Sequence, residues 1–283
     1  MFRGLYTATS GMMANNRQQQ VLTNNLANAA TPGFKKDQTV MRAFPEQLIK
    51  AMESGGTTAG GAKLPGTQKS IGSLHTGVYT QEGIPSFIQG SLKNTGNSAD
   101  LALLSSALPV NPDTGQQGAV SFAVALPNNE IRYTQNGQFT VNADGFLTTA
   151  QGFNVLNQDL QPIRVNSNEF TIGENGQITL ADGTAANSLF LAYTENPQQF
   201  VKEGQNLLRW AGAPGAAPVA IEAAGLGNTG PLVQQGYIEQ SNVDLTQTMT
   251  DMMKTYRGFE SNQKIIQAYD RSMEKAVNEI GRV

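Results

Sequence analysis

Side chains that could carry out chemistry are scarce in this chain of 283 residues. Cysteine is absent, which excludes thiol nucleophiles and zinc-thiolate sites. The single histidine, His75, cannot build a site that needs several imidazole ligands, and its place two residues before Gly77 favours a structural or surface role. We therefore expect no metal-binding residues.

One glycine pattern and the carboxylates are the remaining chemical candidates. Residues 225–230 (GLGNTG) match the G-x-G-x-x-G phosphate-binding pattern, but no strand precedes them and Pro231 follows at once, so we interpret them as a loop without a cofactor. Asp144 and Asp182 each precede a glycine, as turn formers do. We expect no catalytic residue, although two carboxylates that meet only in space could cleave a sugar polymer, and the sequence leaves that alternative open.

The charge and amide content of the sequence indicate what kind of surface the folded protein has. The chain carries 19 Lys and Arg against 22 Asp and Glu, a net charge of −3, whereas Asn and Gln number 24 and 25. Such a neutral, amide-rich surface lacks the positive field that nucleic acid requires and suits packing against copies of the same chain. We also expect no transmembrane segment and no cleaved signal peptide, because neither apolar pattern is present.

The C-terminal residues carry the strongest secondary-structure signal. Alternating steps of four and three residues meet nine apolar side chains in eleven positions, which predicts a helix over residues 243–280, about 57 Å long. A helix with one apolar stripe needs a partner. The stripe consists of Leu245, Met249, Met252, Tyr256, Phe259, Gln263, Ile266, Asp270, Met273, Val277 and Ile280.

A second stripe at the N-terminus offers that partner. Its helix should end before Pro32, because proline disfavours helical geometry in the residue before it. An antiparallel pair with Leu5 opposite Ile280 would bring Asn15 to Asp270 and fix the register through a buried polar contact. The alternative interpretation is that each stripe is the buried face of an ordinary core helix. The stripe consists of Leu5, Ala8, Met12, Asn15, Gln19, Leu22, Leu26 and Ala29.

Between the helices the pattern predicts β-hairpins. Asn136-Gly137, Asp144-Gly145 and Asn175-Gly176 each separate short segments of alternating apolar residues. Asn-Gly and Asp-Gly pairs in that setting are strong signals for two-residue turns. The middle of the chain is therefore expected to be mainly antiparallel β.

Three segments resemble bacterial flagellar rod and hook proteins. Residues 23–35 (TNNLANAATPGFK) resemble the N-terminal signature of that family, and residues 131–156 are similar to its central stretch. Residues 236–244 (GYIEQSNVD) and 257–264 (RGFESNQK) resemble its C-terminal signature. Order and spacing agree along almost the whole chain, which most resembles the basal-body rod proteins, particularly the paired rod proteins of Gram-positive bacteria.

The resemblance implies a set of motif residues near both chain ends. Positions that match the N-terminal and C-terminal signatures are Asn24, Asn25, Leu26, Ala27, Asn28, Thr31, Pro32, Gly33, Phe34, Ser241, Asn242, Val243, Arg257, Phe259, Glu260 and Asn262.

The resemblance also implies an α+β fold with three regions. Residues 1–36 and 240–283 would form a helical coiled-coil domain, residues 37–75 an extended linker with a glycine-rich loop, and residues 76–239 a mainly antiparallel β outer domain. Such proteins are structural subunits that assemble through their terminal helices into the rod, the tubular drive shaft between motor and hook.

Partners and location follow from the same resemblance. The expected partners are copies of the chain, other rod and hook proteins and the flagellar type III export apparatus. The expected location is the basal body, outside the cytoplasmic membrane, after export without a cleaved signal. The alternative function is a rod-associated protein that hydrolyses peptidoglycan, caps the rod or acts as its scaffold.

Overall fold

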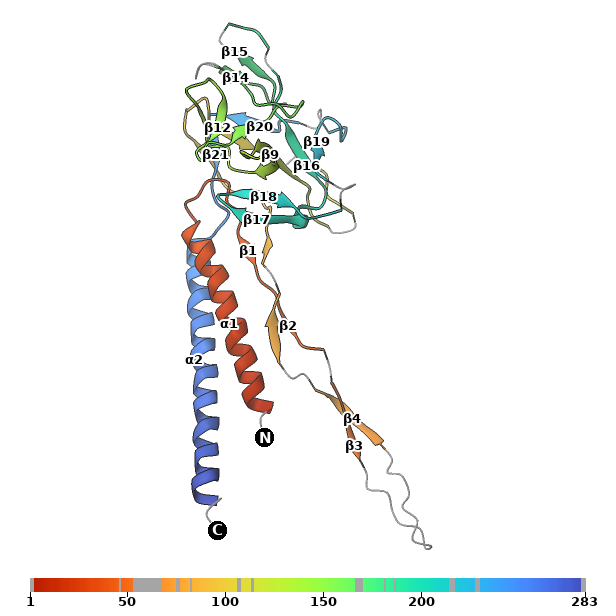
Figure 1. Cartoon of the computed structure of the whole chain (residues 1–283), viewed down its shortest axis with the longest axis vertical. Helices are drawn as coiled ribbons and strands as arrows, with labels where there is room; N and C mark the ends of the chain where they lie inside the picture. The colour runs from red at the N-terminus through yellow and green to blue at the C-terminus, as the bar shows by residue number, and fades with distance from the viewer. Residues whose placement is uncertain are drawn as a thin grey trace. The chain divides into compact units, whose positions relative to one another are not determined.

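The structure is a computed structural model whose contacts divide the chain into two compact units (Figure 1). The helix unit contains Met1–Asn24, Gln38–Gly83 and Thr246–Val283, and the sheet unit contains Asn25–Asp37 and Ile84–Leu245. The residues that the structure describes are 3–45, 47–52, 68–74, 77–81, 83–105, 108–112, 115–165, 170–180, 182–185, 187–213, 217–226 and 230–280.

Two long helices confirm the elements expected at the chain ends. Helix α1 spans Arg3–Ala27, and helix α2 spans Leu245–Lys275 and continues as a π-helical turn over Ala276–Ile280. The first helix ends in hydrogen-bonded turns: the Ala29 amide donates to the Leu26 carbonyl, and the Thr31 amide donates to the Asn28 carbonyl. It therefore stops before Pro32, as its sequence predicts.

An antiparallel ribbon completes the helix unit. Strand β2 (Met41–Ala43) pairs with β5 (Val78–Thr80), and β3 (Gln47–Met52) pairs with β4 (Gln68–Leu74). The ribbon contacts α1 directly: the Val78 amide donates to Ser10 Oγ at 3.3 Å, and Thr80 Oγ1 donates to the Ala14 carbonyl at 3.0 Å. The glycine-rich loop expected at residues 53–66 lies outside the described residues.

The sheet unit is built on a nine-stranded antiparallel sheet. Its main order is β11-β12-β13-β9-β10-β18-β17, and β16 pairs with both β9 and β19. The strands are β9 (Ala119–Ala125), β10 (Ile131–Thr134), β11 (Phe139–Val141), β12 (Leu147–Thr149), β13 (Asn154–Val155), β16 (Leu191–Thr194), β17 (Phe200–Gly204), β18 (Leu207–Trp210) and β19 (Val219–Ala220). A short 3-10 turn, Pro197–Gln199, precedes β17.

Small two-stranded pairs bring distant segments beside this sheet. Strand β20 (Val233–Gln235) pairs with β8 (Leu101–Leu103), and β21 (Tyr237–Glu239) pairs with β7 (Leu92–Asn94). The remaining pairs are β1 (Asp37–Gln38) with β6 (Ile84–Pro85) and β14 (Phe170–Ile172) with β15 (Ile178–Leu180). Together with the helices they give a mixed α and β fold whose strands are mainly antiparallel.

The hydrophobic core lies in the sheet unit. Strand β9 is buried along almost its whole length, because it lies in the middle of the sheet with side chains packed on both faces. Phe122 on this strand meets Phe139 edge to face, with ring centroids 5.0 Å apart. Leu101 and Leu147 are fully buried in the same cluster.

Two of the three expected hairpins are confirmed. Strands β11 and β12 pair around Asp144-Gly145, and β14 and β15 pair around Asn175-Gly176. The hairpin expected at Asn136-Gly137 is wrong, because β10 pairs with β9 and β18 whereas β11 pairs with β12. Instead, the Gly137 carbonyl accepts a hydrogen bond from the Leu101 amide, so this glycine allows β8 to approach closely.

Candidate site at the junction of the two chain ends

The segment that leaves α1 is held in place by residues from the far end of the chain. We define the junction as residues 33–37, 86–90 and 239–242, all within the sheet unit. Asn25, in the last turn of α1, opens it with a reciprocal pair: its Nδ2 donates to the Asp37 carbonyl and its Oδ1 accepts from the Asp37 amide, both at 2.9 Å. The side-chain amide thus satisfies the backbone of Asp37 as a neighbouring strand would.

Gly33 occupies a position that no other residue fits. Its φ of +68° lies in the left-handed region, and a Cβ there would come within 2.5 Å of the Asn136 backbone nitrogen. Its amide donates to the Glu239 carbonyl at 2.8 Å. Glycine is required here because the backbone conformation and the close approach both exclude a side chain.

An ion pair lies at the centre of the junction. Lys35 Nζ is 2.6 Å from Glu239 Oε1, and the two side chains are only 5% and 4% exposed. Lys35 also donates to the Ile88 carbonyl at 3.0 Å, and the Gly90 amide donates to Glu239 Oε1 at 2.6 Å. Burial lowers the pKa of Lys35 from its ordinary value, and the charge and hydrogen bond of Glu239 oppose that shift.

Asn242 joins the same segments through its side chain. Its Oδ1 accepts from the Lys36 amide at 2.7 Å, and its Nδ2 donates to the carbonyls of Ser86 and Ile88 at 2.8 and 2.9 Å. The three segments of the junction therefore share one asparagine. No aspartate could replace it fully, because a carboxylate has no N–H to donate.

Lys202 on β17 contacts the first segment of the junction, residues 33–37. Its ammonium lies 2.8 Å from Asp37 Oδ1 and 4.1 Å from the centre of the Phe34 ring, and it donates to the Lys35 carbonyl. Burial lowers the pKa of Lys202, and the carboxylate of Asp37 opposes the shift. The ring contact adds a cation–π interaction that holds Phe34 against the sheet.

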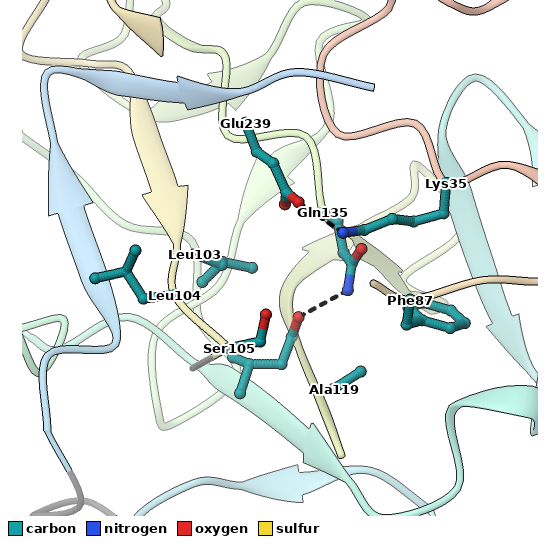
Figure 2. Close-up of a pocket in the computed structure, with 9 residues that line it drawn as sticks. Lys35, Phe87, Leu103, Leu104, Ser105, Ala119, Gln135 and Glu239 are labelled. Carbon is teal, nitrogen blue, oxygen red and sulfur yellow. Dashed lines mark hydrogen bonds and ion pairs between the residues drawn. The ribbon is translucent and has the colours of Figure 1, made fainter. Parts of the chain in front are cut away.

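A small cavity lies beside the ion pair (Figure 2). Lys35, Gln135 and Glu239 are polar residues of its lining, and Gln135 Nε2 donates to the Val120 carbonyl at 3.2 Å. Its apolar lining is Phe87, Leu103, Leu104, Ala119 and Val120, with Ser105 at one side.

The helix unit holds the other predicted residues, and there the helices meet through small and polar side chains. A side chain at Gly4 would overlap the Tyr269 hydroxyl, and one at Gly11 would come within 2.9 Å of Asn262 Nδ2. Further along, Asn15 Nδ2 lies 2.9 Å from where a Cβ of Gly258 would be. As the contacts ascend α1 they descend α2, so the two helices are antiparallel.

These contacts overturn the predicted register. Asn15 lies against Gly258 and not against Asp270, which is 12 residues or about 18 Å further along the helix. The physical reason is that the glycines of α1 allow a close approach that the stripe of large apolar residues would prevent. Asp270 is exposed.

Much of the α2 stripe does not form the buried face of that helix. The buried residues of α2 are instead Thr248 and Thr255, which are seven residues apart. Leu245, Met249, Tyr256 and Val277 are exposed, and Met252, Phe259, Ile266 and Met273 are half-buried. On α1, Leu5, Met12, Leu22 and Leu26 are half-buried. The side chain of Ile280 lies outside the described residues.

The other motif residues lie in local turns or on helix surfaces, except that Pro32 also makes a long-range contact. Asn28 Oδ1 accepts from Thr31 Oγ1, the Pro32 carbonyl accepts from Asn206 Nδ2, and Ser241 Oγ accepts from the Val243 amide. Asn24, Ala27 and Arg257 are exposed, and Glu260 is half-buried.

Sequence reasoning selected Asn25, Gly33, Phe34 and Asn242 but missed most of the charged residues that meet them. The missed residues are Lys35, Asp37, Lys202 and Glu239. Only their charge distinguishes them in the sequence, because the chain has few charged residues. That scarcity is a signal, yet it does not say which base pairs with which acid.

Two of the features considered for chemistry fall at least partly outside the described residues, and the others lie in turns on the surface of the described part of the chain. His75 and residues 227–229 of the glycine motif lie outside the described residues. Asp182 accepts from the amide and hydroxyl of Thr184, as expected of a turn former. Within the described part of the chain, no group of three or more His, Asp or Glu could hold a metal ion. Neither long helix is apolar enough along its length to cross a lipid bilayer.

Three family models match the chain. The description "Flagella basal body rod protein" matches residues 5–35, "Flagellar hook protein FlgE/F/G D1 domain" matches residues 117–180, and "Flagellar basal body rod FlgEFG protein C-terminal" matches residues 234–279.

Full-length relatives agree with these matches. The flagellar hook-basal body complex protein FlhO of Bacillus subtilis is 41% identical over 285 residues, with both chains fully covered. The flagellar basal-body rod protein FlgG of the same organism is 32% identical, covering 98% of this chain and 99% of its own. The FlgG protein of Buchnera aphidicola from Schizaphis graminum is 30% identical, covering 97% and 98%.

Proposed function

Because the chain belongs to the flagellar basal-body rod protein family and is a structural subunit of that kind, we propose that its two terminal helices assemble it with copies of itself and with other rod and hook proteins. The observation that carries the proposal is the exposed apolar surface of the helix unit. Tyr6 and Met13 on α1 are 68% and 66% exposed, and Met253 on α2 is 59% exposed. Large apolar side chains that gather on one face of a helix commonly mark a surface that a partner covers.

The spacing of these side chains supports a partner along each helix. Tyr6 and Met13 are seven residues apart, so they share one face of α1. On α2, Leu245, Met249 and Tyr256 follow the four-and-three spacing of a heptad stripe, and each is about half exposed. We therefore assign these faces to contacts between subunits, and the small and polar seam to an antiparallel coiled-coil-like contact within one subunit.

Export and location complete the proposal. A rod subunit must reach the basal body outside the cytoplasmic membrane, and the family resemblance supports export in unfolded form by the flagellar type III apparatus without a cleaved signal. The names of the relatives, a hook-basal body complex protein and a basal-body rod protein, support a structural role, and we propose no catalytic one.

The test is incorporation into basal bodies. A variant carrying Tyr6→Ser, Met13→Ser and Met253→Ser should be depleted from basal bodies purified from the producing bacterium, and motility should fall. The matched control is Val110→Ser, Val201→Ser and Val219→Ser, which removes three exposed valines from the sheet unit. Fluorescence of Trp210 should stay unchanged in both. Equal incorporation of both variants would refute the proposal.

A further inference from the structure

The geometry points to a buried water that bridges Lys35 and Gln135, and makes Gln135 a positioning residue for the ion pair between Lys35 and Glu239. This inference concerns the cavity of Figure 2 and is independent of the proposed function. It rests on an acceptor, a donor and a cavity of suitable size.

The acceptor is the side-chain oxygen of Gln135. The residue is 7% exposed, and its Oε1 atom has no hydrogen-bond partner among the described residues. Nε2 of the same amide donates to the Val120 carbonyl at 3.2 Å, which fixes its orientation, because a flipped amide would set two oxygens against each other. A buried polar atom of this kind commonly bonds to an ordered water.

The donor is the ammonium group of Lys35. It has three N–H bonds, and within the described residues the structure assigns two of them, to Glu239 Oε1 and to the Ile88 carbonyl. Lys35 and Gln135 both line the cavity, as Figure 2 shows. One water could accept from the ammonium and donate to the amide oxygen.

The cavity fits one water molecule and little else. It leaves about 10 Å³ for the centre of a water, close to the roughly 10–15 Å³ that one water needs. Glu239 supplies a third polar group at its wall, so the site offers the two to four partners that buried water requires. Phe87, Leu103 and Ala119 form the apolar side of the cavity.

The water connects the junction to the centre of the sheet. A chain of hydrogen bonds runs from the Val120 carbonyl on β9 through Gln135 and the water to Lys35, and then to Glu239. Gln135 thereby holds the ammonium in line with the carboxylate. A lysine suits this geometry, whereas the larger guanidinium of an arginine would occupy the space of the water.

The test is NMR of the full chain labelled with ¹⁵N-lysine. The Lys35 ammonium should give a cross-peak to a long-lived water. Gln135→Leu should abolish that cross-peak, and Gln138→Leu, at an exposed neighbouring position, should preserve it. If Gln135→Leu does not fold, Gln135→Met removes the acceptor with a more flexible side chain. A Lys35 ammonium observed without a water contact, or bonded directly to Gln135, would overturn the inference.

Discussion

The junction and the helix pair hold the same two chain ends by opposite means. In the junction, charged and amide side chains are buried and bonded within the chain, as Lys35, Glu239 and Asn242 show. In the helix pair, glycines and polar residues face inward while Met13 and Tyr256 face solvent. One region is complete in a single molecule. The other leaves large apolar side chains exposed, which we propose further subunits cover.

The contrast shows that the residues of a hydrophobic stripe need not be the residues that are buried within a single chain. A stripe predicts that a surface will be covered, but it does not say whether the cover comes from the same chain. For the junction the relevant signal is the opposite one, namely polar residues that have no reason to be buried except to bond each other.

The largest effect should come from breaking the ion pair of the junction. Lys35→Met leaves the Glu239 carboxylate buried without its counter-charge, so the free energy of unfolding of the sheet unit should fall by about 3–5 kcal/mol. Urea titration followed by Trp210 fluorescence measures this loss. The double variant Lys35→Met with Glu239→Gln should recover much of it, because glutamine is neutral and still accepts from Gly90. The exposed control Lys93→Met should change little.

A smaller loss should follow from adding one methyl group at the bend. Gly33 and Gly96 have nearly the same φ, +68° and +69°, but a Cβ at Gly96 would meet nothing within 4 Å. Gly33→Ala should therefore cost about 1–3 kcal/mol more than Gly96→Ala, because only the first also overlaps the backbone of Asn136. The same urea titration compares them. Equal losses would show that the junction can shift to accept a side chain.

The register of the helix pair can be tested with little change in the stability of the sheet unit. The chain has no native cysteine, so an Asn15→Cys and Gly258→Cys pair should form a disulfide under mild oxidation. Asn15→Cys with Asp270→Cys should remain reduced, because that pair is about 18 Å apart along the helices. Mass spectrometry of the monomer distinguishes the two. The reverse result would restore the register predicted from the stripes.

The smallest change in stability should come from disrupting the surface ion network around Glu203. This network contrasts with the buried pair of Lys35 and Glu239. Arg132 lowers the pKa of Glu203 through a hydrogen bond and its charge, with Arg209 adding to the effect. A carboxyl with a lowered pKa stabilises the fold at neutral pH, and this contribution is lost as the pH falls through the folded-state pKa. The contribution of the network to stability should therefore be largest near pH 7 and should decrease as the pH falls below the ordinary carboxyl pKa of 4.5.

The variant Glu203→Gln tests the expected direction of this pH dependence. The difference in urea midpoint between the wild type and the variant should be small at pH 7 and should shrink as the pH is lowered below 4.5, with the exposed Glu222→Gln showing no such trend. A difference that grows as the pH falls would contradict the assigned direction.

Local pattern was enough to predict the helices and two hairpins. Helix α2 begins within two residues of the predicted start, and the turns at Asp144-Gly145 and Asn175-Gly176 form as expected. Each of these depends on neighbouring residues, so the sequence carries the needed information. Asn136-Gly137 failed because the tertiary contact of Gly137 with Leu101 outweighs the local turn preference.

Contacts between distant segments were not predictable in the same way. Lys35 and Glu239 are 204 residues apart, and no spacing rule selects one pair among the many charged side chains. The register of the helices depends on glycines, and these glycines are not part of either apolar stripe. The expected domain boundaries at residues 36 and 240 remain predictions, although the bonds of Gly33, Lys35 and Lys36 to residues 239–242 explain why residues 25–37 cluster with the sheet unit.

The close placement of the junction bonds has a mechanical consequence. The Gly33 amide, the Lys35 ammonium and the Lys36 amide all bond to the short segment from Glu239 to Asn242. Tension that pulls the two chain ends apart would load these bonds in parallel, so that they must fail together. Bonds loaded in this way withstand a larger pulling force than bonds that open in succession.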